Sequence, residues 1–234
     1  MSGDERGGGK LSTRNQVDAF LAKVRAAPVP APGRRGRLIF ALDATASREP
    51  TWDAACQIQA EMFNETAALG GLDVQLVFYR GFAELVAGPW DSRAPDMLAR
   101  MGAVRCLAGQ TQIAKVLAHA RDEARRGKVD ALVFVGDCVE EDVDTLGRIA
   151  GELGLLGVRA FLFHEGANAD ARRAFEHIAK LTGGACCPFD RASAGQLRDL
   201  LSAVAVYAAG GRRALENFSQ RRGGATLLLT KQVR

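Results

Sequence analysis

Five oxygen-bearing side chains stand at the ends of predicted buried elements. Asp43, Thr45 and Ser47 follow an uninterrupted apolar strand at a spacing of two, and alternate residues of an extended segment face the same way. Thr111 opens a predicted helix, and Asp137 ends a second apolar strand. Carboxylate and hydroxyl oxygens are hard donors, which suit Mg²⁺ or Mn²⁺ better than zinc. Asp43, Thr45 and Ser47 are therefore candidate ligands of one divalent cation.

The two strands that lead to Asp43 and Asp137 are typical of the centre of a parallel sheet. Residues 38–42 and 131–135 are apolar without alternation, as expected for strands that are covered on both faces. Ligands of open α/β sheets bind at the carboxyl ends of the strands, where the strand order reverses. The candidate ligands are therefore expected at that edge of the sheet.

Strand and helix patterns alternate along most of the chain, which predicts a doubly wound, mostly parallel α/β sheet with helices on both faces. A very short connection at Arg80-Gly81 predicts that one strand pair is an antiparallel hairpin. The predicted strands span residues 37–42, 72–79, 82–86, 131–135, 158–163 and 185–189. The predicted helices span residues 50–69, 94–101, 111–126, 140–153, 169–181 and 194–206.

We expect three segments along the chain. Residues 1–36 form a basic N-terminal extension with a short helix and a proline-rich linker, and residues 37–207 form the main domain. Residues 208–234 form a basic C-terminal extension with a short helix and a strand at 225–233. A free terminal strand often adds to a sheet edge, so this strand would pack on its own domain or join subunits of a homo-oligomer.

The pattern Asp-x-Thr-x-Ser at residue 43, followed by Thr111 and then Asp137, resembles the metal-ion-dependent adhesion site (MIDAS) of von Willebrand factor A (VWA) domains. The family pattern is Asp-x-Ser-x-Ser after the first strand, a Thr in a later loop and an Asp that ends a later strand. Thr45 replaces a serine here, and Gly-Asp-Cys replaces the frequent Thr-Asp-Gly, but no oxygen donor is lost. The resemblance covers about residues 37–207.

This resemblance implies a six-stranded sheet in the order 3-2-1-4-5-6 with one antiparallel edge strand. It also implies that Mg²⁺, Mn²⁺ or Ca²⁺ at the site bridges to an exposed Asp or Glu of a partner protein. The likeness is to the intracellular bacterial type of VWA protein, whose members often work beside ATP-driven remodelling or chaperone complexes. The chain is therefore expected to be a binding module and not an enzyme.

Two alternatives stay open. In the first, a VWA-like scaffold has a degenerate, metal-free site and associates through its terminal extensions. In the second, the chain is a Mg-dependent phosphohydrolase, since a strand that ends in Asp43 with a Thr two residues later also resembles the haloacid-dehalogenase family. Those enzymes need a general acid–base where Thr45 stands, and threonine cannot act as one. His164, which precedes Glu165 at a predicted strand end, is a candidate for lining the cleft.

Composition and charge bear on location and partners. The chain is 47% hydrophobic and 25% charged, and it has no uncharged apolar run of the length that spans a bilayer, which predicts a cytoplasmic protein. The net charge of +4 divides into +5 for residues 1–37, +5 for residues 208–234 and −6 for the middle. Phe218 alone interleaves with the arginines of these ends, so nucleic-acid binding is poorly supported. The five cysteines lack zinc spacing and are expected to be buried, reduced thiols.

Overall fold

The computed structural model describes residues 35–189 and 194–233. Six strands form one sheet in the order β3-β2-β1-β4-β5-β6, which confirms the predicted order. β3 pairs antiparallel with β2, and the other four pairs are parallel. The helix and the proline-rich linker predicted before residue 35 lie outside the described residues.

The elements agree with the predicted ones in type and order through β6. The strands are β1 (Gly36–Asp43), β2 (Leu72–Arg80), β3 (Glu84–Asp91), β4 (Ala131–Gly136), β5 (Arg159–Glu165) and β6 (Ala185–Phe189). The α-helices are α2 (Glu49–Ile58), α3 (Ala60–Thr66), α4 (Ala94–Gly102), α5 (Ile113–Arg126), α6 (Val143–Leu155), α7 (Ala169–Thr182), α8 (Ala194–Arg222) and α9 (Gly224–Gln232). Two 3-10 helices, η1 (Ala46–Arg48) and η2 (Ala67–Leu69), precede α2 and follow α3.

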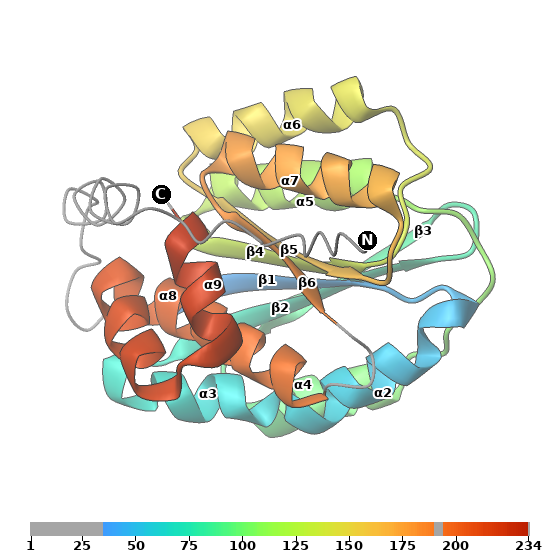
Figure 1. Cartoon of the computed structure of the whole chain (residues 1–234). Coiled ribbons are helices and arrows are strands. Elements are labelled where there is room, and N and C mark those ends of the chain that lie inside the picture. The colour runs from blue at the N-terminus through green and yellow to red at the C-terminus, as the bar shows by residue number, and fades with distance from the viewer. Residues whose placement is uncertain (1–34, 190–193, 234) are drawn as a thin grey trace, which may run out of the picture.

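Helices cover both faces of the sheet, and β1 lies at its centre. α5, α6 and α7 lie on one face, whereas α2, α3, α4 and α8 lie on the other (Figure 1). Leu38, Phe40 and Leu42 of β1 belong to the core on the α8 side, and Ile39 and Ala41 belong to the core on the α5 side. Because alternate residues of β1 enter different cores, the strand is apolar without alternation.

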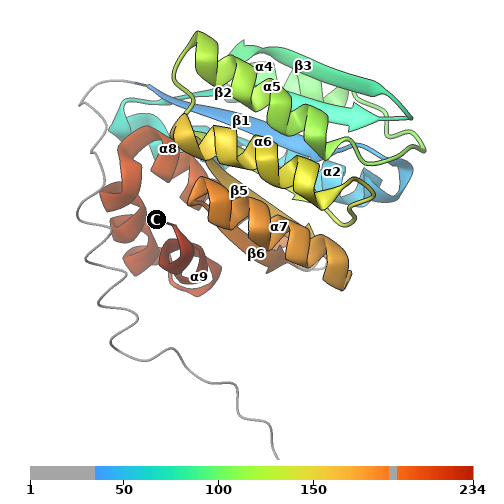
Figure 2. The same cartoon turned by 90° about the horizontal axis from the view of Figure 1, so that it is seen from above.

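The carboxyl ends of β1 and β4 meet at one edge of the sheet. The two strands are parallel neighbours, and Leu42 lies opposite Val135. β1 also pairs with β2, so the strand order reverses direction between β1 and β4. The helices that follow β1 and β4 lie on opposite faces of the sheet (Figure 2). Asp43 and Asp137 therefore leave the sheet side by side at the position where such folds bind ligands.

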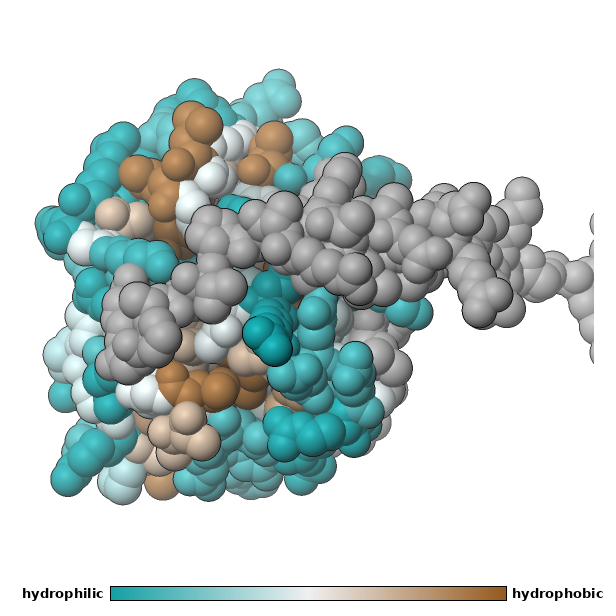
Figure 3. All heavy atoms as spheres, turned by 90° about the vertical axis from the view of Figure 1, so that its left-hand side faces the viewer, coloured by the Kyte–Doolittle hydropathy of each residue, from teal (hydrophilic) through white to brown (hydrophobic). Residues whose placement is uncertain are grey.

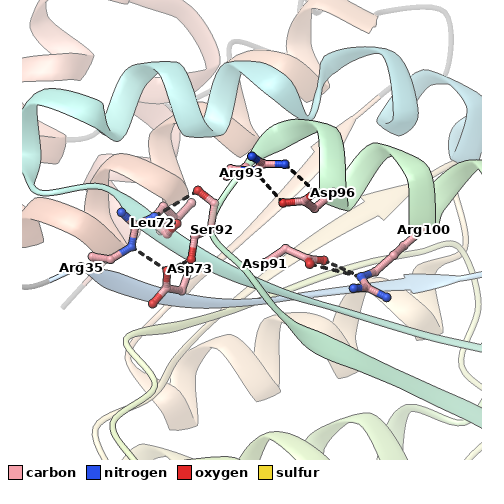
Figure 4. A network of polar contacts seen from close by, with 8 residues as sticks. All are labelled: Arg35, Leu72, Asp73, Asp91, Ser92, Arg93, Asp96 and Arg100. Atoms are coloured by element: carbon pink, nitrogen blue, oxygen red, sulfur yellow. Dashed lines mark hydrogen bonds and ion pairs between the residues drawn. The ribbon is translucent and has the colours of Figure 1, made fainter.

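The edge strand β3 is held by ion pairs and hydrogen bonds at its carboxyl end (Figure 4). Arg100 of α4 contacts Asp91 at the last position of β3, with 2.9 Å between Nε and Oδ2. Arg35, just before β1, donates to the carboxylate of Asp73 at 2.6 Å, and Ser92 donates to the same oxygen at 2.8 Å. These contacts tie the antiparallel edge to β1, β2 and α4.

The prediction of a strand at residues 225–233 is wrong, because these residues form most of α9. Leu229 and Val233 are buried in the core that also contains α8, and the side chain of Gln232 accepts a hydrogen bond from the Cys186 backbone amide of β6 at 2.8 Å. The apolar run in this segment suits a strand or a buried helix equally, and packing against α8 and β6 decides for the helix. The expectation of subunit exchange through a terminal strand therefore loses its basis.

Two helices also differ from the prediction in extent. The helix predicted over residues 50–69 is divided at Gln59 into α2 and α3. The helix predicted to end at residue 206 runs on to Gly211, whose φ of 68° interrupts the helical conformation, and a second helical stretch follows to Arg222, in the segment where a short helix was expected; both stretches carry the label α8. Glycine adopts this left-handed conformation without the cost that a side chain imposes.

No helix within the described ranges is both long and apolar enough to cross a membrane.

Candidate functional site

Asp43 is buried at the carboxyl end of β1, with 4% of its surface exposed. One of its carboxylate oxygens, Oδ1, accepts a hydrogen bond from the backbone amide of Thr45 at 2.8 Å, which turns the chain at the strand end. Burial raises the pKa of Asp43, and the charge of Asp137 acts in the same direction, whereas the bonds from Thr45 and the charge of Arg48 oppose it. Asp43 and Asp137 are thus close enough to interact electrostatically.

The two hydroxyls that follow Asp43 lie nearer the surface. Thr45 is half-buried, and Ser47 is exposed within η1. The loop that joins β1 to these residues is held by the segment before α5, because the Leu107 amide donates to the Ala44 carbonyl at 3.0 Å. Asp43 is therefore buried at this edge, whereas the residues that carry the two hydroxyls reach its surface.

Thr111 is joined to the loop that follows Asp137. Its backbone amide donates to Glu140 Oε2 at 2.8 Å, and its hydroxyl oxygen accepts from the Glu140 backbone amide at 3.0 Å. A threonine at the start of a helix can cap the helix through its hydroxyl or give the same oxygen to a metal. The hydroxyl does not cap α5, whose N-cap is Gln112. Instead it joins the loop before α5, which contains Thr111, to the loop after β4, which contains Asp137 and Glu140.

The acidic residues after Asp137 serve two different helices. Asp142 caps α6 by accepting from the Thr145 amide at 2.8 Å. Glu141, by contrast, accepts from the amides of Ile113 and Ala114 at 2.9 and 2.7 Å, at the beginning of α5. The dipole of α6 therefore explains Asp142 and Asp144 only, because Glu140 and Glu141 bond to the Thr111 amide and to the first amides of α5. Their negative charges compensate the unpaired amides at the start of α5.

Arg48 is the main residue that the sequence analysis missed. Its side chain is 1% exposed and lies between two carboxylates, at 3.3 Å from Nη1 to Asp137 Oδ2 and at 2.6 Å from Nη2 to Glu165 Oε2. The hydroxyl of Thr51 donates to the same Glu165 oxygen at 2.6 Å. The guanidinium thus links η1 to the ends of β4 and β5. The signal that could have found Glu165 is its position after an apolar strand, which it shares with Asp43 and Asp137.

The two residues at the end of β5 face opposite sides of the sheet. Glu165 faces Arg48, whereas His164 packs on the α7 side with its ring edge-on to Phe175, at 5.7 Å between ring centroids. His164 is buried, and burial lowers its pKa. The expectation that His164 lines an open cleft is therefore wrong.

Carboxylates outnumber guanidinium groups at this edge. Arg48 contacts the carboxylates of Asp137 and Glu165, and its charge also acts on buried Asp43. Within the described residues, no three His, Cys, Asp or Glu side chains gather closely enough to hold a metal ion. A cation here would therefore depend on the hydroxyl donors as well as on Asp43 and Asp137, as hard ions such as Mg²⁺ accept.

The sheet order, the antiparallel edge strand and the helices on both faces define a VWA-like α/β fold. The sequence matches no family model and no curated protein. Among solved structures, the fold is similar to a von Willebrand factor type A protein from Catenulispora acidiphila, with a TM-score of 0.58 and 16% identity over 73% of this chain and 43% of that one. The chain thus spans less than half of that protein.

Two further structures extend the comparison. The SpRpn10 VWA domain has a TM-score of 0.54 and 13% identity over 74% of this chain and 95% of that domain. Proximal thread matrix protein 1 from the mussel byssus has a TM-score of 0.57 and 18% identity over 74% of this chain and 46% of that one, and its MIDAS motif is occupied by zinc. At such identities the likeness establishes the fold.

Proposed function

We propose that the chain is a protein-binding module in which a divalent cation, Mg²⁺ in the first place, is held by Asp43, Thr45, Ser47, Thr111 and Asp137. The observation that carries the proposal is that Arg48 contacts two carboxylates, Asp137 and Glu165, and interacts with a third, Asp43, at an edge that also presents hydroxyl oxygens. A divalent ion would add positive charge where carboxylates outnumber the guanidinium. When bound, the ion would supply a positive centre that a carboxylate of a partner can reach.

The donor set favours a bridging ion. The hydroxyls of Thr45, Ser47 and Thr111 are neutral, so an ion that they hold remains electron-poor and attracts a further anionic ligand. An exposed Asp or Glu of another protein has the matching charge and oxygen chemistry. The partner is therefore a protein with an accessible acidic side chain. A remodelling or chaperone complex as that partner rests on the sequence resemblance alone.

Exposed apolar side chains around the site favour a protein partner over a small anion. Phe82, in the turn after β2, is 77% exposed, and Leu107 and Val143 are also exposed. The turn that carries Phe82 lies against the loop before Thr111, since the Gln110 amide donates to the Gly81 carbonyl at 3.0 Å. Large exposed apolar residues near polar groups are common where proteins associate.

Apolar side chains also gather at the opposite edge of the sheet, on the face that Figure 3 shows. α6 and α7 end at this edge, where Leu155, Leu156 and Leu181 are exposed. None of the candidate ligands lies at these helix ends, so within residues 35–189 and 194–233 the edge with Asp43 is the one that combines exposed apolar residues with the proposed cation site.

The test is capture of partners from a cell extract in Mg²⁺ and in chelator, with the wild type and Asp43→Ala. We expect capture by the wild type in Mg²⁺ and its loss both in chelator and in Asp43→Ala. Asp122→Ala, which replaces a half-buried acid on α5 that pairs with Arg121, is the matched control and should behave as the wild type. Calorimetric titration with Mn²⁺ should give binding to the wild type and none to Asp43→Ala. Capture that is indifferent to the chelator would contradict the proposal.

The contact between Arg48 and Asp137 favours a second candidate, a VWA-like scaffold without metal. There the guanidinium alone would satisfy Asp137, and association would use the terminal segments. Chelation would then change neither thermal stability nor capture. We propose no enzymatic activity; phosphatase turnover that disappears in Asp43→Asn would restore the phosphohydrolase alternative.

A further inference from the structure

The buried guanidinium of Arg48 has two unequal ion pairs. The pair with Glu165 is short, at 2.6 Å, and both side chains are almost fully buried, at 1% and 6% exposed. The pair with Asp137 is longer, at 3.3 Å, and the Asp137 side chain is 32% exposed. Asp137 is therefore the partner that Arg48 releases at the smaller cost, since its carboxylate can regain contact with water.

Glu165 is in turn fixed by a second donor. The hydroxyl of Thr51 in α2 bonds to the same oxygen that Arg48 contacts, at 2.6 Å. Glu165, which Thr51 holds in place, thus keeps the guanidinium in position whether or not Asp137 contacts it. This arrangement provides a positive charge of fixed position beside two of the proposed metal ligands, Asp43 and Asp137.

We propose that Arg48 is a built-in cation that competes with the divalent ion for Asp137 and thereby sets the cation affinity of the site. Without metal, Arg48 compensates Asp137 and keeps the loop after β4 in place. With metal, Asp137 turns to the ion, and Arg48 stays paired with Glu165. Arg48 is a positioning residue in this scheme, and the metal arm of the inference rests on the proposed function.

Two consequences follow from this competition. Removal of the guanidinium leaves Asp137 and buried Glu165 without their counter-charge, which destabilises the metal-free protein. The same removal takes away the group that competes with the ion for Asp137. It also takes away a positive charge that repels the ion, so divalent cations bind more tightly. Arg48→Met should therefore lower the thermal midpoint in chelator and raise the affinity for Mn²⁺.

The experiment measures the thermal midpoint in chelator and in Mn²⁺, and the Mn²⁺ affinity by calorimetry, for the wild type and Arg48→Met. We expect a lower midpoint in chelator for Arg48→Met, a larger gain on adding Mn²⁺ than the wild type shows, and Mn²⁺ binding that is tighter by about tenfold or more, equal to about 1.4 kcal/mol. Arg80→Met is the matched control, because Arg80 lies at the same edge but pairs with Glu84. It should leave both quantities near the wild-type values.

Glu165→Gln keeps the test decisive if Arg48→Met does not fold. Loss of this carboxylate leaves Asp137 as the remaining ionic partner of Arg48, so Mn²⁺ should bind more weakly than to the wild type, while Glu84→Gln should not change it. Equal Mn²⁺ responses in Arg48→Met, Arg80→Met and the wild type would overturn the inference, as would unchanged or tighter binding in Glu165→Gln. Mn²⁺ binding that appears only in Arg48→Met would support the inference and contradict the proposed function of the wild type.

Discussion

Thr111 and Glu140 are joined by two hydrogen bonds that run in opposite directions. The Thr111 amide donates to the Glu140 carboxylate at 2.8 Å, and the Glu140 amide donates to the Thr111 hydroxyl at 3.0 Å. Glu140 lies three residues after Asp137, so this pair determines how the loop before α5 approaches the loop after β4. The geometry of the candidate site depends on this link as much as on the ligands themselves.

Thr111→Val should weaken the link with almost no change in volume. The Glu140 amide then lacks its acceptor, and leaving a partly buried donor unpaired costs about 1 to 3 kcal/mol. The free energy of unfolding from urea titration in chelator measures this cost. Thr111→Ser keeps the hydroxyl and is the control. A Thr111→Val protein as stable as Thr111→Ser would show that the link contributes nothing.

Asp43 gives a pH dependence whose sign is set by burial. Burial raises the pKa of Asp43 above its ordinary value of 3.8, so the folded protein keeps this proton to a higher pH than the unfolded chain does. The contribution of Asp43 to stability therefore falls as the pH rises from about 3.8 through the raised pKa. Asp43→Asn removes this titration while its amide oxygen can still accept from the Thr45 amide.

In chelator, Asp43→Asn should thus be more stable than the wild type at pH 7, and the difference should shrink as the pH falls toward 4. Mg²⁺ should stabilise the wild type at pH 7 and leave Asp43→Asn unchanged. Thermal midpoints at a series of pH values, with and without Mg²⁺, check both statements. If Asp43→Asn were the less stable protein at pH 7, the hydrogen bonds from Thr45 and the charge of Arg48 would outweigh the cost of burying the charge.

The central part of the fold could be predicted from the sequence because its signals are local and redundant. The apolar runs that end at Asp43 and Asp137 each identify a strand covered on both faces, and the resemblance to VWA domains gave the strand order. α9 could not be predicted in the same way. Its apolar run fits a strand or a helix, and the deciding contacts come from α8 and β6, far away in the sequence.

The candidate site could likewise be predicted only in part. The ends of the predicted strands indicate where Asp43 and Asp137 leave the sheet. No local pattern indicates that Arg48 turns inward to Glu165, which lies 117 residues away. Arginine is rarely buried, so an arginine after Ser47 reads as a solvent-exposed residue. The position of Glu165 at the end of β5 is the one feature from which the pair could have been inferred.

α9 should contribute to stability by covering the open edge of β6. Gln232→Ala removes the acceptor of the Cys186 amide and should lower the free energy of unfolding by about 1 kcal/mol. Leu229→Ala opens a cavity in the core and should lower it by about 2 to 5 kcal/mol. Lys231→Ala, at an exposed position of the same helix, is the control. Urea unfolding measures the three values, and size-exclusion chromatography reports whether an uncovered β6 edge leads to association.

Two half-buried cysteines, Cys56 and Cys106, should be poor nucleophiles at neutral pH. Burial raises the pKa of Cys56 and of Cys106 to about 11, so at pH 8 only about 0.1% of either thiol is ionised. Alkylation by iodoacetamide, followed by mass spectrometry, should be slow at pH 7 and should accelerate about tenfold per pH unit up to about pH 10, because the thiolate is the reactive form. In urea all five cysteines should react at similar rates. Rapid labelling of the folded protein at pH 7, or a disulfide between Cys56 and Cys106, would instead indicate a redox function of these thiols.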